Sequence, residues 1–175
     1  TLVNAIVGEV IVPTGVLPTT AHIDVLRFGP RRAAQLHLED GTIEEIALRD
    51  VKKRVKSDDG SIDHIEYLYP HPILRRVNFW DTPGFNALDD DHERRAGEAL
   101  ERAEAIVWVL DATQALAQTE LSHLERIHSP RERLVVVVNK TDRLADGEVE
   151  ETLAHLAKAL DGLGFVGIYA VSGLR

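Results

Sequence analysis

Four short apolar segments, each with the length of a buried strand, constrain the fold of this chain most strongly. They cover residues 77–80, 105–110, 134–138 and 168–171. Amphipathic helical patterns alternate with them, over residues 92–103, 118–127 and 149–160. Because alternating strands and helices form parallel sheets through right-handed crossovers, the sequence predicts an α/β fold. We expect a mostly parallel sheet, buried on both faces by helices.

The first third of the chain has a different pattern. Residues 33–38 and 43–48 alternate apolar and polar side chains around a turn at residues 39–42, which is typical of a β-hairpin. Residues 62–69 have the pattern of a further strand. The sequence therefore predicts an antiparallel insert over about residues 30–72, within a single domain that spans residues 1–175.

Composition excludes several classes of function. The 29 acidic side chains outnumber the 20 basic ones, and a net charge of -9 repels nucleic acid and anionic lipid. Two short basic clusters, at residues 52–54 and 75–76, are expected to be solvated. The chain has no cysteine, which excludes disulfides and thiolate metal sites and fits a cytoplasmic protein. No spacing of His, Asp and Glu predicts a metal site made by protein ligands alone.

The first polar motif, Asp81-Thr82-Pro83-Gly84, directly follows the segment at residues 77–80. In doubly wound sheets ligands bind beyond the carboxyl ends of strands. An aspartate there can hold magnesium through water, and a glycine lets its N–H approach a terminal phosphate. The alternative is an ordinary Pro-Gly turn.

The second motif, Asn139-Lys140-Thr141-Asp142, also follows a predicted strand. It groups an amide, a long apolar stem and a carboxylate, which suit a purine ring. A carboxylate can accept hydrogen bonds from both N1–H and the exocyclic amine of guanine, whereas adenine would leave it unpaired. The alternative is a pair of capping residues before the next helix.

The third motif, Ala170-Val171-Ser172-Gly173, ends the last predicted strand. Its small residues allow the backbone to approach a base, although a plain turn has the same composition. All three motifs follow strands, so the predicted sheet brings them to one edge.

These three motifs resemble, in order, the third, fourth and fifth signature boxes of P-loop GTPases. The opening residues 1–8, Thr-Leu-Val-Asn-Ala-Ile-Val-Gly, are similar to the helix that follows the phosphate-binding loop of that family. On this resemblance the loop would precede Thr1, and the chain is expected to be an incomplete G domain, truncated at both ends. Taken alone, it is expected to bind GTP weakly and to lack hydrolysis.

Residues 12–20, Val-Pro-Thr-Gly-Val-Leu-Pro-Thr-Thr, are similar to the first switch of dynamin-like GTPases, especially bacterial ones. The stretch Pro-Ile-Leu-Arg-Arg at residues 72–76 also resembles the bacterial dynamin-like pattern. The resemblance implies that Thr20, and not Thr19, is the switch threonine that faces magnesium and the γ-phosphate.

The resemblance assigns a role to each candidate residue. It implies that Thr20 and Gly84 are catalytic, and that Thr20 and Asp81 hold Mg2+. It further implies a nucleotide-binding set made of Asn139, Lys140, Asp142, Ser172 and Gly173.

The family also implies GTP and GDP as ligands, a monovalent cation as a second cofactor, and a homodimer of G domains. Peripheral contact with membrane lipid would use regions outside this chain, and no nucleic-acid partner is expected. The predicted function is GTP hydrolysis coupled to membrane remodelling. Two alternatives are a nucleotide-gated scaffold with little hydrolysis and a soluble ribosome-assembly or translation GTPase.

Overall fold

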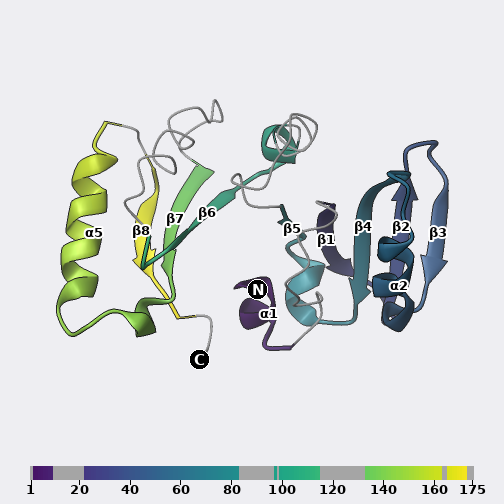
Figure 1. Ribbon diagram of the computed structural model, residues 1–175, viewed down its shortest axis with the longest axis horizontal. Helices are drawn as coiled ribbons and strands as arrows, with labels where there is room; N and C mark the ends of the chain where they lie inside the picture. The colour runs from purple at the N-terminus through teal and green to yellow at the C-terminus, as the bar shows by residue number, and fades with distance from the viewer. Residues whose placement is uncertain are drawn as a thin grey trace. The chain divides into compact units, whose positions relative to one another are not determined.

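The computed structural model describes residues 2–9, 22–82, 97, 99–114, 133–162 and 165–172. The chain divides into two compact units, Thr1–Gly97 and Glu98–Arg175 (Figure 1). Each unit has its own sheet and its own hydrophobic core. The mixed α/β content confirms the fold class predicted from the sequence.

The first unit contains a five-stranded sheet with the order β3-β2-β4-β1-β5. Its strands are β1 (Ile23–Phe28), β2 (Ala33–Leu38), β3 (Ile43–Ile46), β4 (Ile62–Tyr69) and β5 (Phe79–Asp81). The pair β1–β4 is parallel, and the pairs β1–β5, β2–β3 and β2–β4 are antiparallel. The predicted hairpin is confirmed, and the insert strands extend the sheet through β4.

The hairpin turn follows from three consecutive residues. The Asp40 carboxylate accepts a hydrogen bond from the Thr42 N–H at 2.8 Å, and Gly41 N–H donates to the Leu38 carbonyl at 2.9 Å. Gly41 has a φ of 84°, a conformation that side chains disfavour. The turn chemistry therefore sets the register of β2 against β3.

The core of the first unit lies on one face of this sheet. Leu26, Leu36 and Ile62 are almost fully buried there, and each stabilises the fold by roughly 1.5–3 kcal/mol. Helix α1 (Leu2–Val7) and helix α2 (Val51–Lys56) each contribute a buried valine to the same cluster. The 3-10 helices η1 (Leu48–Asp50) and η2 (Pro72–Arg75) complete the described elements of this unit.

The second unit contains a parallel sheet of β6 (Ile106–Asp111), β7 (Leu134–Asn139) and β8 (Gly167–Ala170), in that order. Helix α5 (Glu148–Ala159) covers one face, where Leu110, Val136 and Leu156 are fully buried. The 3-10 helix η5 (Thr141–Arg143) follows β7. The strand and helix positions agree with the predicted segments to within one or two residues at each end.

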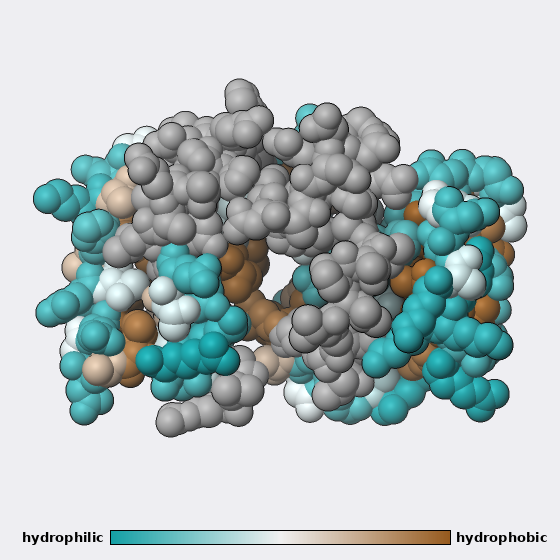
Figure 2. Space-filling model, viewed as in Figure 1, coloured by the Kyte–Doolittle hydropathy of each residue, from teal (hydrophilic) through white to brown (hydrophobic). Residues whose placement is uncertain are grey.

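The opposite face of this sheet carries apolar side chains that are partly exposed. Val107, Val109 and Tyr169 are 52%, 45% and 54% exposed. Figure 2 shows apolar surface, coloured brown, on the side of this sheet away from α5. Among the described helices of this unit, α5 packs against the other set of alternating side chains.

The strand predicted at residues 77–80 differs from the observed strand β5 (Phe79–Asp81) in its bounds and its exposure. Strand β5 begins two residues later, pairs antiparallel to β1, and leaves Trp80 41% exposed. Of the helix predicted over residues 92–103, residues 97 and 99–102 are helical, and the helix predicted over residues 118–127 lies outside the described residues. Within the described segments, no helix has the length and apolar character needed to cross a bilayer.

Candidate functional site

The structure describes part of the predicted site. Among the candidates, Thr20, Gly84 and Gly173 lie outside the described residues, so their roles stay predictions. Asp81 belongs to the first unit, and the remaining candidates, Asn139, Lys140, Asp142 and Ser172, belong to the second. Each unit is considered by itself.

In the second unit, the carboxyl ends of three parallel strands lie at one edge of the sheet. The end residues Asp111 and Asn139 are register partners, and the Ala112 N–H donates to the Asn139 carbonyl at 2.8 Å. The Val171 N–H donates to the Val138 carbonyl at 2.8 Å, which joins the end of β8 to β7. The sheet therefore brings the motifs at residues 139–142 and 170–172 together, two of the three that the sequence predicted at one edge. Asp81, which begins the third, ends a strand of the other sheet.

Lys140 has a backbone conformation that is uncommon for residues other than glycine. Its φ of 64° and ψ of 32° are left-handed, and among the described residues other than glycine it alone has a positive φ. The Asn139 side-chain oxygen accepts a hydrogen bond from the Lys140 N–H at 2.8 Å. Such conformations cost about 1–3 kcal/mol and are enriched at ligand-binding and catalytic sites.

The Lys140 ammonium group pairs with Asp111, a residue that sequence reasoning missed. Lys140 Nζ donates to Asp111 Oδ2, and the Thr113 hydroxyl donates to Asp111 Oδ1 at 2.7 Å. These hydrogen bonds, that from Lys140 foremost, lower the pKa of Asp111 to about 2. Asp111 thus stays ionised at neutral pH and holds the lysine stem along this edge of the sheet. A carboxylate at the end of an apolar strand was the available signal.

Asp142 and Ser172 connect two of the predicted motifs. The Ser172 hydroxyl donates to Asp142 Oδ1 at 2.6 Å, although the residues lie 30 positions apart in the sequence. The Thr141 hydroxyl also donates to the Val171 carbonyl at 3.0 Å. The hydrogen bond from Ser172 orients the Asp142 carboxylate. Because Asp142 is exposed, this carboxylate is accessible to a ligand.

This arrangement can recognise a planar ring with two adjacent donors. Asp142 supplies a carboxylate oriented by Ser172, and charge-assisted hydrogen bonds to a carboxylate are about twice as strong as neutral ones. The apolar stem of Lys140, anchored at its far end by Asp111, can cover one face of such a ring. The geometry suits guanine better than adenine, which presents an acceptor at the same edge.

In the first unit, Asp81 ends β5 and has a second carboxylate beside it. Asp24 on β1 is its cross-strand partner, a neighbour that sequence reasoning did not identify. Burial, and then the charge of Asp81, raises the pKa of Asp24 to about 7, although the hydroxyl of Tyr67 donates to it. Burial also raises the pKa of Asp81. Only the pairing of β1 with β5 brings these residues together, so no sequence spacing could have shown it.

The paired carboxyl groups fit a hard divalent cation. Magnesium binds oxygen ligands and is usually held by one or two carboxylates together with water and phosphate. Two carboxyl groups whose ionisation is disfavoured by burial gain most from a nearby positive charge. The residues present therefore suit Mg2+, with Asp81 as the ligand the sequence predicted and Asp24 as a supporting carboxylate.

Comparison with known proteins identifies relatives of the whole chain. The family model described as the dynamin family matches residues 1–142. Dynamin-like protein A of Bacillus subtilis is 28% identical over 95% of this chain and 15% of its own length. A probable transmembrane GTPase, FZO-like and chloroplastic, from Arabidopsis thaliana is 28% identical over 89% of this chain and 15% of its length. The bacterial dynamin-like protein of Nostoc punctiforme is 26% identical over 86% of this chain and 24% of its own length.

Solved structures agree on the fold. The solved structure of an oligomerised bacterial dynamin pair matches with a TM-score of 0.75 and 17% identity. That pair is described as providing a mechanism for the long-range sensing and tethering of membranes. The match covers 98% of this chain and 28% of that one. This chain therefore spans less than a third of that protein, and between 15% and 24% of the three named relatives.

Proposed function

This chain belongs to the dynamin family, and on that premise we propose that it binds GTP through the strand ends of its second unit. The hydrogen bond between Ser172 and Asp142 carries the proposal. It joins two motifs that were singled out independently from the sequence, and it orients the carboxylate that would select guanine. The Asn139 amide and the anchored stem of Lys140 would complete the base site.

We further propose that the protein hydrolyses GTP by in-line attack of water on the γ-phosphate. Asp81 would hold Mg2+, with Asp24 as its neighbour, and the ion would neutralise charge on the phosphates. Thr20 would contact the ion from the first switch, and Gly84 would contact the γ-phosphate through its backbone N–H. Phe85 follows Gly84 where small GTPases have a glutamine, so another group would orient the attacking water.

The coupling of hydrolysis to membranes is proposed for the full-length protein. Its support is the family and the solved bacterial dynamin pair, whose description names membrane sensing and tethering. The oligomeric state named for that pair favours a homodimer of G domains. A monovalent cation as a second cofactor is proposed from the family resemblance alone. The net charge of -9 of this chain opposes binding to anionic lipid. Peripheral membrane contact of the full-length protein, which we propose to be cytoplasmic, would therefore use other regions.

A competition experiment tests nucleotide choice. The full-length protein is loaded with a fluorescent GTP analogue, which unlabelled GTP, GDP and ATP then displace in separate titrations. We expect GTP and GDP to displace the analogue at least a hundredfold more effectively than ATP. Equal displacement by ATP would contradict the proposed base site.

A phosphate-release assay separates hydrolysis from simple binding. Single-turnover rates are measured with Mg2+, with and without liposomes of mixed neutral and anionic lipid. Stimulation by liposomes supports coupling to membranes. A slow rate that liposomes leave unchanged would instead support a nucleotide-gated scaffold.

A further inference from the structure

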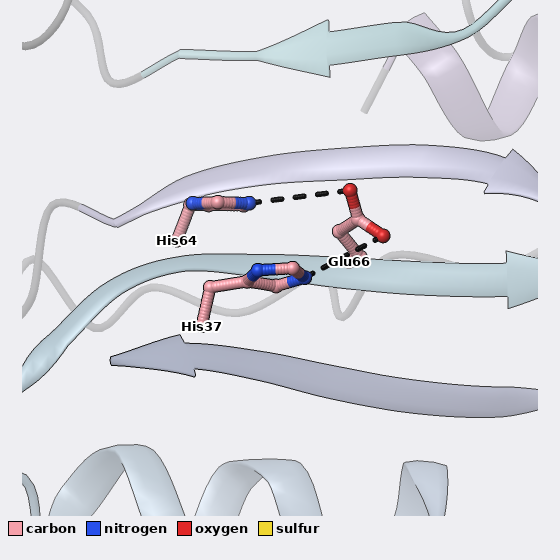
Figure 3. Close-up of side chains that lie close together, drawn as sticks. All are labelled: His37, His64 and Glu66. Atoms are coloured by element: carbon pink, nitrogen blue, oxygen red, sulfur yellow. Dashed lines mark ion pairs between the residues drawn. The ribbon is translucent and has the colours of Figure 1, made fainter. Parts of the chain in front are cut away.

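Three side chains with metal-binding groups lie together on the insert, in the first unit. His37 on β2 and His64 on β4 are register partners, and Glu66 lies two residues further along β4 on the same face. Figure 3 shows both imidazole rings with their Nε2 atoms directed toward the Glu66 carboxylate. This cluster lies on the opposite face of the sheet from Asp24 and Asp81, because His64 and Glu66 alternate along β4 with Ile65, the register partner of Asp24.

The distances approach those of a metal site. His37 Nε2 lies 3.5 Å from Glu66 Oε2, and His64 Nε2 lies 4.0 Å from Glu66 Oε1. One ligand atom from each residue can be chosen so that all three lie within 4.8 Å of one another. Zinc bonds of about 2.0–2.2 Å in a tetrahedral site separate ligand atoms by about 3.3 Å. Both histidine–glutamate pairs therefore need to close by less than about 1 Å. The widest separation among the three ligand atoms needs to close by up to about 1.5 Å for them to share one ion.

A neighbouring carboxylate prepares His64 as a ligand. Asp63 Oδ2 lies 2.7 Å from His64 Nδ1, so a proton on Nδ1 is donated to Asp63 and the lone pair remains on Nε2. A histidine that binds metal through one nitrogen commonly donates from the other to a carboxylate. The lone pair then faces a Glu66 oxygen, and two acceptors that face each other are stabilised by a cation between them.

The His37 ring provides a second observation. Its Nε2 atom is buried and makes no hydrogen bond with any residue that the structure describes, although Glu66 lies nearby. A buried polar atom without a partner costs about 1–3 kcal/mol. Coordination of an ion between His37 and Glu66 would remove that cost.

Two features oppose metal binding, and both are small. The Arg27 guanidinium donates to Glu66 Oε1 at 2.7 Å, but its side chain is 48% exposed, so water screens its repulsion of a cation. The two carboxylates of Glu66 and Asp63 outnumber the one guanidinium of Arg27, so these three groups carry a net charge of about -1. The two rings are stacked, with centroids 4.1 Å apart and planes at 16°, and must turn to direct both lone pairs at one ion. That turn is about χ2, a torsion with a broad energy minimum in histidine.

We propose that His37, His64 and Glu66 form a site for a divalent transition-metal ion, best matched by Zn2+. Two imidazoles and one carboxylate are the ligand set of several zinc sites, with water in the fourth position. Both histidine side chains are 22% exposed, so the cluster lies near the surface of the unit. The ion joins β2 to β4 and so stabilises the insert.

Zinc titration of the full chain against a chromophoric chelator tests the site. We expect one Zn2+ per chain, and an affinity loss of more than a hundredfold in each of His37→Gln, His64→Gln and Glu66→Gln. Asp63→Asn should lose about 10–100-fold, as expected for a residue that orients a ligand. His155→Ala is the matched control, since His155 is exposed on α5, and it should bind as the parent does.

A spectroscopic measurement distinguishes this site from zinc bound elsewhere. The Trp80 ring lies 6.3 Å from the His64 ring, so Co2+ at the site should quench Trp80 fluorescence. A Trp108→Phe background leaves Trp80 as the remaining tryptophan. Quenching should disappear in His64→Gln, whose circular dichroism spectrum checks that the variant is folded. Zinc stoichiometry and quenching that survive in all three glutamine variants would overturn the proposal.

Discussion

Replacing Asp24 by asparagine should stabilise the protein at alkaline pH. The folded chain holds the pKa of Asp24 at about 7, mainly through burial and then through the charge of Asp81, compared with an ordinary value of 3.8. Folding therefore favours the protonated carboxyl group. The contribution of protonated Asp24 to the free energy of unfolding is fully present below about pH 4 and is lost as the pH rises to about 7. Asparagine is neutral throughout and still offers an oxygen to the Tyr67 hydroxyl.

The magnitude follows from the two pKa values. The difference between about 7 and 3.8 corresponds to about 4 kcal/mol at pH 8, which is an upper bound because Asp24 keeps partial contact with solvent. Water and backbone relaxation reduce this cost, so we expect a gain of about 2 kcal/mol. For a chain of 175 residues, that gain raises Tm by about 4–8 °C.

Urea and thermal unfolding of the parent and Asp24→Asn, in EDTA and without nucleotide, measure the effect between pH 4 and pH 8. The gain should be near zero at pH 4 and should grow until about pH 7. Asp59→Asn, at an exposed position in the same unit, is the matched control and should change little. A gain in Asp24→Asn that is the same at pH 4 and pH 8 would refute the reasoning.

Three further changes have expected outcomes. Ser172→Ala removes the donor to Asp142 and should weaken GTP binding about fivefold, measured by calorimetry, since such a bond contributes about 1 kcal/mol. Thr20→Ala in the full-length protein should still bind GTP but lose most of its turnover in a phosphate-release assay. If Thr19→Ala is the damaging change instead, the assigned register is wrong. Leu156→Ala should lower the free energy of unfolding by about 2–5 kcal/mol, because that side chain is fully buried under the second sheet.

Much of the fold follows from local patterns in the sequence. The hairpin was predictable because alternation and the turn at residues 39–42 agree, and α5 because its leucines repeat with helical spacing. Helix α2 was not predicted, because its sequence, Val-Lys-Lys-Arg-Val-Lys, is short and looks like a solvated basic cluster. The antiparallel direction of β5 was also missed, since an apolar run does not indicate which neighbour it pairs with.

The site residues also fall into two groups, those that short sequence motifs indicate and those that only strand pairing brings together. Asn139, Lys140, Asp142 and Ser172 could be placed at strand ends from the sequence, because each ends or follows a strand within a short motif. Their roles in nucleotide binding stay predictions. Partners that strand pairing brings together could not be found, because their sequence separations are large and irregular. The separation is 29 residues between Asp111 and Lys140. The same reason hides the pairs Asp24–Asp81 and His37–His64.

The central claim is that the carboxylate of Asp142 selects guanine. Equilibrium binding of GTP and xanthosine triphosphate to the full-length protein and to Asp142→Asn tests it most directly. Loss of hydrogen bonds to a charged group should weaken GTP binding about 10–100-fold. Xanthine has an acceptor in place of the exocyclic donor, so the same variant should bind xanthosine triphosphate more tightly than the parent does. Unchanged affinity for GTP in Asp142→Asn would contradict the account.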